Sequence, residues 1–385
     1  MDPGFRRGDN FDLEVGKEVF MPNHDLIRND FLRQALACEH LGSPFTARVC
    51  RALAAGLTAE TRFGQRILDW EGKPESDALP LRAAGALNAL ARSGRAPELA
   101  AVYPPHEADE KTLARAIEKA TAAHDDFLEG FLDSAPQTNE VARSSAILGL
   151  ALHVAKRTGL PLSVHEIGSS AGLNLGFDAY AYELETARWG DPDAAVTIAA
   201  RWEGALPPLD AKLKVAARKG CDLNPLDAGN AADRERLLAY IWPDQTARLA
   251  RIEAALSFAA RSGTKVEKAD AAEWVERHFG GEGKKGEVRL LMHTIVWQYL
   301  PKETQARITA AMARAGAHAT KDAPVAWISV EADGKDAASA CMRLRLWPEG
   351  EDVELGRTDF HGRWAKWSSP FDRASVSTSP RFRTI

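Results

Sequence analysis

One segment constrains the fold of this chain more than any other: a short apolar run that passes through a glycine-containing turn into a helix. It is residues 162–175, LSVHEIGSSAGLNL, in which the apolar run reaches Glu166 and the turn spans residues 168–172. Small residues let backbone N–H groups approach a ligand closely, and the start of the following helix faces that ligand. The segment therefore predicts a strand–turn–helix connection that binds a nucleotide or another cofactor.

The spacing of the glycines separates the cofactor classes. A dinucleotide fingerprint G-x-G-x-x-G starting at Gly168 would need glycine at two positions that hold Ser170 and Leu173. A phosphate-binding P-loop would end in Gly-Lys-Ser/Thr, which is absent. What remains is an acidic residue followed by two glycines, Glu166-x-Gly168-x-x-x-Gly172. The alternative without a ligand is a tight connection between a strand and a helix.

The second half of the chain alternates between strand-like and helix-like segments, which predicts an α/β fold with a parallel sheet. An antiparallel hairpin is expected around residues 348–350, so the sheet is predicted to be mixed. The expected strands are 161–166, 266–269, 288–293, 325–330, 338–347 and 351–357, and the expected helices are 172–180, 231–260 with a break at Pro243, and 302–316.

The first part of the chain reads as all-helical. Residues 21–135 are rich in Ala, Leu and Arg, and Trp70 is the first of ten tryptophans, the other nine lying between Trp189 and Trp367. The sequence predicts a helical domain here, with helices near 25–40, 46–56, 59–70, 80–93 and 109–133. In the first of them, Leu26, Phe31, Ala35 and Leu36 recur near the helical period and are expected to face the core.

Composition excludes several classes of function. The 49 Lys and Arg against 54 Asp and Glu give a net charge of −5, which disfavours binding to duplex nucleic acid. The four cysteines do not have the spacing of metal ligands, so no metal site is expected. They are expected to be free thiols in the cytoplasm. No apolar run is long enough to span a bilayer, so no membrane partner is expected. Residues 1–20 lack the apolar region of a signal peptide and are expected to be a disordered leader or tail.

Five segments together resemble a known family: 137–144 (QTNEVARS), 166–175 (EIGSSAGLNL), 220–227 (GCDLNPLD), 240–245 (YIWPDQ) and 344–350 (LRLWPEG). The combination is similar to a bacterial family of domains of unknown function with a core like that of class I methyltransferases. The resemblance covers about residues 140–367. It implies a Rossmann-like methyltransferase domain over residues 136–385 and S-adenosylmethionine as the cofactor.

The same resemblance implies a set of cofactor-binding residues. The glycine turn would hold the methionine part, an acid after the second strand the ribose, and an acid after the third strand the adenine amino group. Asp222 is preferred for the ribose over Glu183 and Glu185, which makes residues 178–212 an insertion with a hairpin around residues 190–192. The alternatives are a solvated turn for these acids and a helix N-cap for Asp270. The predicted cofactor residues are Glu166, Gly168, Ser170, Gly172, Asn174, Asp222, Asp270 and Ala271.

Candidates for chemistry lie at the end of the fourth strand. His293 is a candidate general base because its ordinary pKa is near 6.5, and Tyr299 would orient a substrate. The alternative for His293 is a core histidine whose hydrogen bonds are satisfied within the protein. His361, Arg363 and Trp364 in the last hairpin either bind an aromatic or anionic substrate or pack at the sheet edge.

The QTNEVARS segment is the other candidate for substrate contact. Gln137, Asn139, Glu140 and Arg143 are expected to form a lid or a substrate site. The alternative is a helix N-cap at Asn139 with a surface pair between Glu140 and Arg143.

These predictions lead to a methyltransferase with a small-molecule or unknown acceptor. Alignment and desolvation carry most of methyl transfer, so the lack of a catalytic triad excludes nothing. A cofactor-binding or sensing protein without catalysis is the second hypothesis. An NAD-dependent oxidoreductase is the third, and the missing glycines argue against it. The sequence leaves the oligomeric state open.

Overall fold

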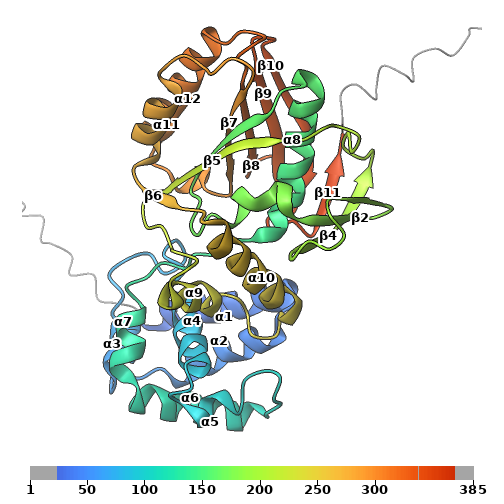
Figure 1. Ribbon diagram of the computed structural model, residues 1–385. Coiled ribbons are helices and arrows are strands. Elements are labelled where there is room, and N and C mark those ends of the chain that lie inside the picture. The colour runs from blue at the N-terminus through green and yellow to red at the C-terminus, as the bar shows by residue number, and fades with distance from the viewer. Residues whose placement is uncertain (1–23, 337, 369–385) are drawn as a thin grey trace, which may run out of the picture.

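The computed structural model describes residues 24–336 and 338–368 (Figure 1). The predicted leader at residues 1–20 lies outside the described residues. Within them the protein is a mixed α/β structure, with one group of helices at the bottom of Figure 1 and a large sheet with its own helices above it. None of the described helices is both long and apolar enough to cross a membrane.

Every regular element in residues 24–131 is a helix, as the composition predicts. Three of the helices begin at side-chain caps, with Ser43, Thr61 and Asp109 each accepting a backbone N–H of the first turn. The predicted helix over 109–133 is two helices, which break at His124. The helices are α1 (His24–His40), α2 (Pro44–Gly56), α3 (Arg62–Leu68), α4 (Leu79–Arg92), α5 (Pro97–Ala100), α6 (Glu110–Ala123) and α7 (Asp125–Phe131).

The predicted core face of α1 is wrong in part. Phe31 and Ala35 are buried as expected, but Leu26 and Leu36 are 58% and 63% exposed. The buried stripe instead runs through Ile27, Phe31, Ala35 and Cys38. The apolar residues of this helix are spread over most of its surface, so their periodicity alone does not determine which face is buried.

The upper part of the molecule is built on one sheet of eleven strands in the order β3-β2-β4-β11-β10-β9-β8-β7-β1-β5-β6. Its strands are β1 (Leu162–Ile167), β2 (Ala181–Leu184), β3 (Ala187–Trp189), β4 (Thr197–Gly204), β5 (Val215–Asp222), β6 (Val266–Lys268), β7 (Val288–Thr294), β8 (Val325–Glu331), β9 (Ala340–Trp347), β10 (Glu351–Thr358) and β11 (Trp364–Trp367). The predicted hairpin is confirmed as the antiparallel pair β9 and β10.

Five strands, β6-β5-β1-β7-β8, form a parallel block. Counted along the chain, their spatial order is third, second, first, fourth, fifth. The chain leaves β1 toward β5 and later returns to the other side of β1 with β7. The order therefore reverses between β1 and β7, and open α/β sheets bind ligands at the carboxyl ends of the strands beside such a reversal.

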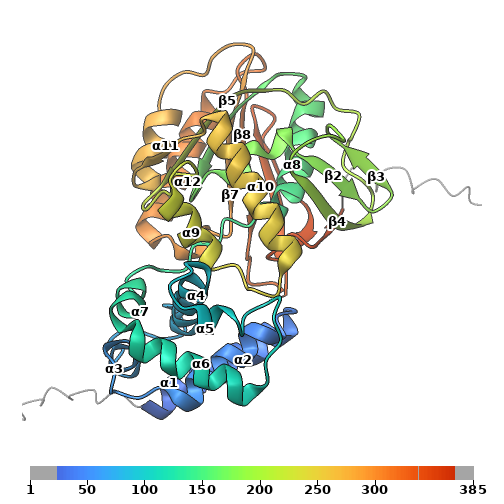
Figure 2. The ribbon, with the colours of Figure 1, turned by 60° about the horizontal axis from the view of Figure 1, so that its bottom comes forward.

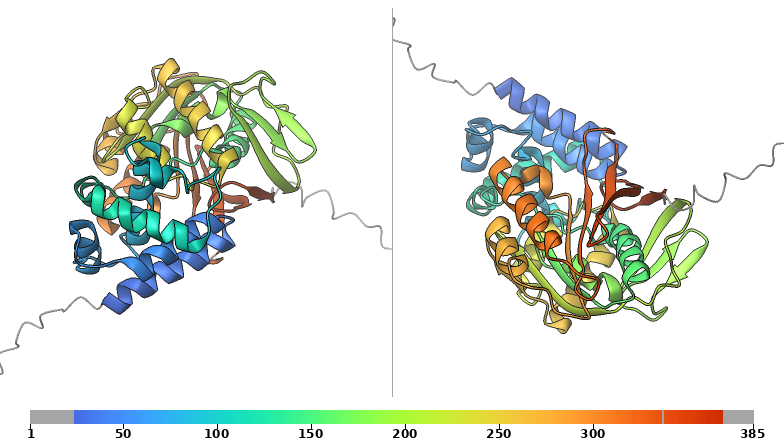
Figure 3. Two further views of the ribbon diagram at one scale, coloured as in Figure 1. Left: turned by 90° about the horizontal axis from the view of Figure 1, so that it is seen from below. Right: turned by 90° about the horizontal axis from the view of Figure 1, so that it is seen from above.

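Helices cover both faces of this block. On one face, α8 (Ser144–Thr158) and α10 (Thr246–Ser262) share a hydrophobic cluster with Leu162 and Val164 of β1. On the other face, α11 (Ala271–Phe279) and α12 (Lys302–Ala317) pack on Leu291 of β7 and Trp327 of β8. The view from above in Figure 3 shows the sheet between these two helical layers. Successive side chains along each strand therefore face α8 and α10 on one side of the sheet and α11 and α12 on the other.

The connection from β1 to β5 differs from the prediction. The expected helix over 172–180 is a short 3-10 helix, η2 (Leu173–Ala179). The segment predicted to be an insertion forms β2, β3 and β4, and its hairpin joins β2 to β3 through Glu185 and Thr186 rather than turning around residues 190–192. Glu185 itself adopts a positive φ of 54°, which allows so tight a turn. Strand β4 then pairs with β2 and with β11, which joins this segment to the last described strand.

The segment YIWPDQ, residues 240–245, connects the sheet layer to the N-terminal helices. It follows α9 (Ala231–Ala239) and precedes α10, the helix that crosses in front of the sheet in Figure 2. Asn88 of α4 donates from Nδ2 to the carbonyls of Ala239 and Ile241, at 2.9 and 3.0 Å. Asp244 accepts the backbone N–H of Phe45 at 2.8 Å. The break at Pro243 thus exposes backbone and side-chain groups that bind α2 and α4.

Candidate functional site

The glycine turn lies at the carboxyl end of β1, beside the reversal of strand order. Glu166 is in register with Gly220 of β5 and with Met292 of β7. Gly168, Ser170 and Gly172 all have positive φ values, of 67°, 52° and 71°. A Cβ on Gly168 would also lie 2.5 Å from Val296. Both glycines are therefore required by the path of the backbone and by packing.

The backbone N–H groups of the turn are largely used within the protein. Ser169 donates to the carbonyl of Cys221 at 3.0 Å, and Ser170 donates to Oδ2 of Asp222 at 2.9 Å. Gly172 and Leu173 donate to Ser169 and to Oδ1 of Asn139. A loop that cradles a pyrophosphate needs free N–H donors, so this turn is poorly suited to a dinucleotide.

Side-chain acceptors around the same turn have no partner instead. Four oxygen atoms are buried and accept no hydrogen bond from the described residues. They are Oε2 of Glu166, Oγ of Ser170, Oδ1 of Asn174 and Oε1 of Gln137. Buried polar atoms are nearly always hydrogen-bonded, because leaving one unpaired costs about 1–3 kcal/mol. The turn is thus suited to a ligand that brings N–H or O–H donors.

Glu166 is the most perturbed acid of this cluster. Its side chain faces the α8 and α10 side of the sheet, as Leu162 and Val164 do, and it is 2% exposed. Burial raises the pKa of Glu166 to about 8, and the negative charge of Asp222 adds to the rise. A donor that carries positive charge would favour the ionised carboxylate.

The QTNEVARS segment crosses the turn and is buried from Asn139 onward. Asn139 accepts the N–H of Leu173 at 2.9 Å, and Gln137 donates to the carbonyl of Asn224 at 2.9 Å. The helix cap predicted at Asn139 is wrong, since Glu140 caps the 3-10 helix η1 (Val141–Arg143).

The surface pair predicted between Glu140 and Arg143 is wrong as well. Glu140 is fully buried and forms ion pairs with Arg248, at 2.6 Å, and Arg251, at 3.4 Å, both on α10. The pKa of Glu140 is lowered, because the charges of Arg248 and Arg251 outweigh the effect of burial. These two pairs tie the segment to α10.

Arg143 of the same segment is a buried cation. It is 9% exposed, and its Nε donates to the carbonyl of Phe360 at 2.7 Å. Among the described residues it forms no ion pair with a carboxylate. Burial lowers the pKa of its guanidinium, and the charges of Glu140 and Glu331 act in the opposite direction. The guanidinium is therefore available to a ligand carboxylate.

The structure separates the candidates for the ribose. Asp222 ends β5 next to the turn, where its two carboxylate oxygens accept the N–H groups of Ser170 and Asn224, each at 2.9 Å. Glu183 and Glu185 lie exposed on the hairpin of β2 and β3, at the other end of the sheet order. Only Asp222 is brought to the turn.

Asp270 lies after β6 and caps α11. Its Oδ1 accepts the N–H groups of Ala272 and Glu273, at 2.9 and 3.1 Å. The N-cap alternative is thus confirmed, and Oδ2 accepts no hydrogen bond from the described residues. Ala271, the first residue of α11, is buried.

His293 lies on the opposite face of the sheet from Glu166. It points to the α11 and α12 side, where both of its ring nitrogens are engaged. Nε2 accepts the indole N–H of Trp327 at 2.9 Å, and Nδ1 lies 2.7 Å from Oε1 of Glu331. This assigns the proton to Nδ1 and leaves no free lone pair, so the arrangement is that of a satisfied core histidine. The candidate base and the glycine turn are not brought together.

Of the remaining predicted residues, His361 and Arg363 are brought together with Glu140, Arg248 and Arg251, which line the same cavity. Tyr299 is 71% exposed, on the 3-10 helix η3 (Trp297–Tyr299). Arg363 bonds Asp359 at 2.6 Å, and no cation–π contact joins it to Trp364 among the described residues. His361 lines two cavities, of about 140 and 360 Å³, between the N-terminal helices and the sheet layer, and burial lowers its pKa to about 4.

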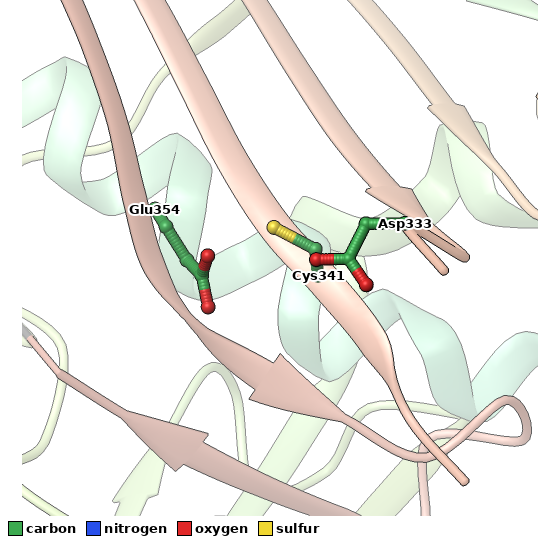
Figure 4. Close-up of side chains that lie close together, drawn as sticks. All are labelled: Asp333, Cys341 and Glu354. Atoms are coloured by element: carbon green, nitrogen blue, oxygen red, sulfur yellow. The ribbon is translucent and has the colours of Figure 1, made fainter. Parts of the chain in front are cut away.

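One further cluster has the spacing of metal ligands (Figure 4). Asp333 and Glu354 flank the thiol of Cys341, and their ligand atoms lie within 4.8 Å of one another. Arg357 already binds Asp333 through both carboxylate oxygens, at 3.0 Å each, and lowers the pKa of Asp333 to about 2. Burial raises the pKa of Cys341 to about 11, so its thiol stays protonated. An ion-pair network explains this cluster without a metal.

Sequence reasoning missed three residues of these sites: Arg248, Trp327 and Glu331. Arg248 neutralises the buried Glu140, and the other two fix the ring of His293. No motif marks them, because each acts on a residue far away in the sequence. For Glu331 the available signal is a charged residue at the end of an otherwise apolar strand.

The fold and the groups around the glycine turn define a mixed α/β protein with a candidate ligand site at the carboxyl ends of its parallel strands. The chain belongs to a bacterial family, since the model of a family described as "Uncharacterized protein conserved in bacteria (DUF2332)" matches residues 28–367. The predicted membership in a bacterial family of domains of unknown function is thus confirmed. No curated protein and no solved structure matches the chain.

Proposed function

We propose that the protein is a methyltransferase that binds S-adenosylmethionine on a Rossmann-like sheet. One observation carries the proposal: the unpaired buried acceptors of Glu166, Ser170, Asn174 and Gln137 around the glycine turn. Their number and type fit a ligand with an ammonium group and hydroxyl groups, which supplies donors. The occupied N–H groups of the turn favour a cofactor without phosphate over NAD.

The residues present fit the cofactor part by part. Glu166 and Asn174 would accept from its ammonium group, and the buried Arg143 would pair with its carboxylate. Asp222 would accept from the ribose hydroxyls, and the free Oδ2 of Asp270 from the adenine amino group. When bound, S-adenosylmethionine supplies a methyl group that its sulfonium already activates.

The contribution of this chain's own residues is to hold and orient the ligand and to exclude water from it. The glycine turn is fixed by its hydrogen bonds to Asn139 and Asp222, so its side chains are positioned before a ligand arrives. Such preorganisation lowers the entropic cost of alignment, which is the main requirement of methyl transfer. The acceptor is a small or still unidentified molecule, and the protein is expected to act in the cytoplasm.

A specific observation favours a second candidate, a cofactor-binding or sensing protein without catalysis. Both ring nitrogens of His293 are engaged, which leaves no assigned base near the turn. A methyltransferase built this way would need an acceptor that is already nucleophilic near neutral pH. Binding of the cofactor without turnover on a broad acceptor panel would support the sensing protein.

Calorimetric titration of the full chain with S-adenosylmethionine, S-adenosylhomocysteine and NAD tests the proposal. We expect both adenosyl ligands to bind and NAD not to bind. Glu166→Gln keeps the shape of the side chain but removes its charge, and it should weaken binding by about tenfold to a hundredfold. Glu183→Gln, at an exposed position of β2, is the matched control and should bind like the wild type. No binding of either adenosyl ligand would refute the proposal.

A further inference from the structure

A groove of about 700 Å³ runs between α12 and β9, on the face of the sheet away from Glu166. We call it the α12–β9 groove. Its floor is formed by β8 and β9, where Ser329 pairs with Arg343 and Trp327 pairs with Arg345. Nothing in the cofactor proposal uses this groove.

The groove is open because α12 presents small side chains to it. Ala306, Thr309, Ala310 and Ala313 line it and are exposed. The larger residues of the helix, such as Ile308 and Met312, are buried against α11 and β7. The chain thus builds a groove where longer side chains on the same helix face would have closed it.

Aromatic rings form one wall. The ring of Trp297 stacks on that of His293, with centroids 5.1 Å apart and planes 20° from parallel. Trp327 lies 5.6 Å from Trp297, and the guanidinium of Arg345 covers the ring of Trp327 at 4.7 Å. A planar ring would find both apolar and π surface here.

Basic side chains line another part of the groove. Lys302, Arg343 and Arg345 line it, and the two arginines bind Asp352 through Nε, at 2.6 and 3.1 Å. Their terminal N–H groups donate to none of the described residues. The charges of these three side chains therefore favour an anionic ligand group.

One buried acceptor lines the groove as well. Glu331 is only 8% exposed. Its Oε1 lies beside the ring of His293 and accepts the N–H of Val296 at 3.1 Å. Its Oε2 is buried and has no hydrogen-bond partner among the described residues. A ligand that donates an N–H or O–H to this atom would satisfy it.

We propose that the α12–β9 groove binds a small aromatic carboxylic acid that also carries an N–H or O–H donor. The ring contacts Trp297 and Trp327, the carboxylate is bound by the basic side chains, and the donor pairs with Glu331. The inference does not depend on S-adenosylmethionine, because none of the residues proposed to hold that cofactor lines the groove.

Titration calorimetry with indole-3-acetate tests the proposal, since this probe combines the ring, the ring N–H and the carboxylate. Tryptamine has the same ring with an ammonium group, and acetate has the carboxylate without the ring. We expect binding of indole-3-acetate at millimolar concentration or below, and binding at least tenfold weaker for the other two. No binding of indole-3-acetate, or equal binding of tryptamine, would overturn the proposal.

Two variants place the binding in the groove. Ala310→Trp fills it from an exposed position and should abolish binding of indole-3-acetate, whereas Ala317→Trp, on an exposed turn of α12 outside the groove, should leave it unchanged. Lys302→Ala removes one charge without adding bulk and should weaken binding by about tenfold. If Ala310→Trp binds the probe like the wild type while its fold is intact by circular dichroism, the groove is not the site.

Discussion

Substituting Glu166 by glutamine changes how the stability of the protein depends on pH. In the unfolded chain this carboxyl group titrates at its ordinary pKa of 4.5, and in the folded chain at about 8. As the pH rises through this window, the unfolded state releases the proton and the folded state keeps it. The wild type therefore loses stability as the pH rises from about 4.5 to about 8.

The magnitude follows from the size of the pKa rise. The folded and unfolded pKa values differ by about 3.5 units, and each unit corresponds to 1.36 kcal/mol. The wild type therefore loses about 5 kcal/mol of stability, and this loss is complete above about pH 8. Glutamine keeps the shape of the side chain but cannot ionise, so Glu166→Gln lacks this loss. We expect the stability difference between variant and wild type to grow by about this amount, in favour of the variant, between acidic and alkaline pH.

Urea unfolding of both proteins, followed by circular dichroism from about pH 5 to about pH 9, measures the difference. All other titrating groups are shared, so their contributions cancel in the comparison. Glu183→Gln, an exposed substitution, should follow the wild type at every pH. Parallel curves for wild type and Glu166→Gln would refute the reasoning, because they would show that Glu166 ionises normally in the folded protein.

Two further predictions concern stability. Glu140→Ala leaves two arginines of α10 without their buried partner and should lower the free energy of unfolding by about 3–5 kcal/mol. The control, Glu110→Ala on the surface, should change it little. Equal effects of the two variants in urea unfolding would contradict this account. Gly168→Ala should cost about 1–3 kcal/mol through its positive φ and its contact with Val296, and adding Val296→Ala should recover only the contact part. Full recovery in the thermal unfolding of the double variant would show that backbone strain contributes nothing.

Local sequence signals predicted much of the secondary structure. The helices of residues 24–131, the break at Pro243 and the final hairpin follow from composition, proline and turn residues, which act over a few positions. The same signals could not choose the core face of α1, because apolar residues occur on most of its surface. Packing against α2 buries Ile27 and Cys38 and leaves Leu26 and Leu36 exposed.

The candidate site was predictable only in part. The glycine turn was predictable because its glycines occupy positions that need a positive φ, and Asp222 lies beside it as predicted. His293 was grouped with the turn because both lie at strand ends. The alternation of side chains along β1 and β7 places Glu166 and His293 on opposite faces, which depends on the register of both strands.

The sequence by itself determined the class of the protein: helices first, then alternating strands and helices with a glycine turn after the first strand. These features are local, since each depends on the conformational preferences of neighbouring residues. Only the tertiary structure decided which polar groups have partners. Glu140 pairs with two arginines about a hundred residues away, while Glu166 and Asn174 keep buried oxygen atoms to which no described residue donates. Pairing of this kind depends on distances in space, and sequence spacing does not encode them.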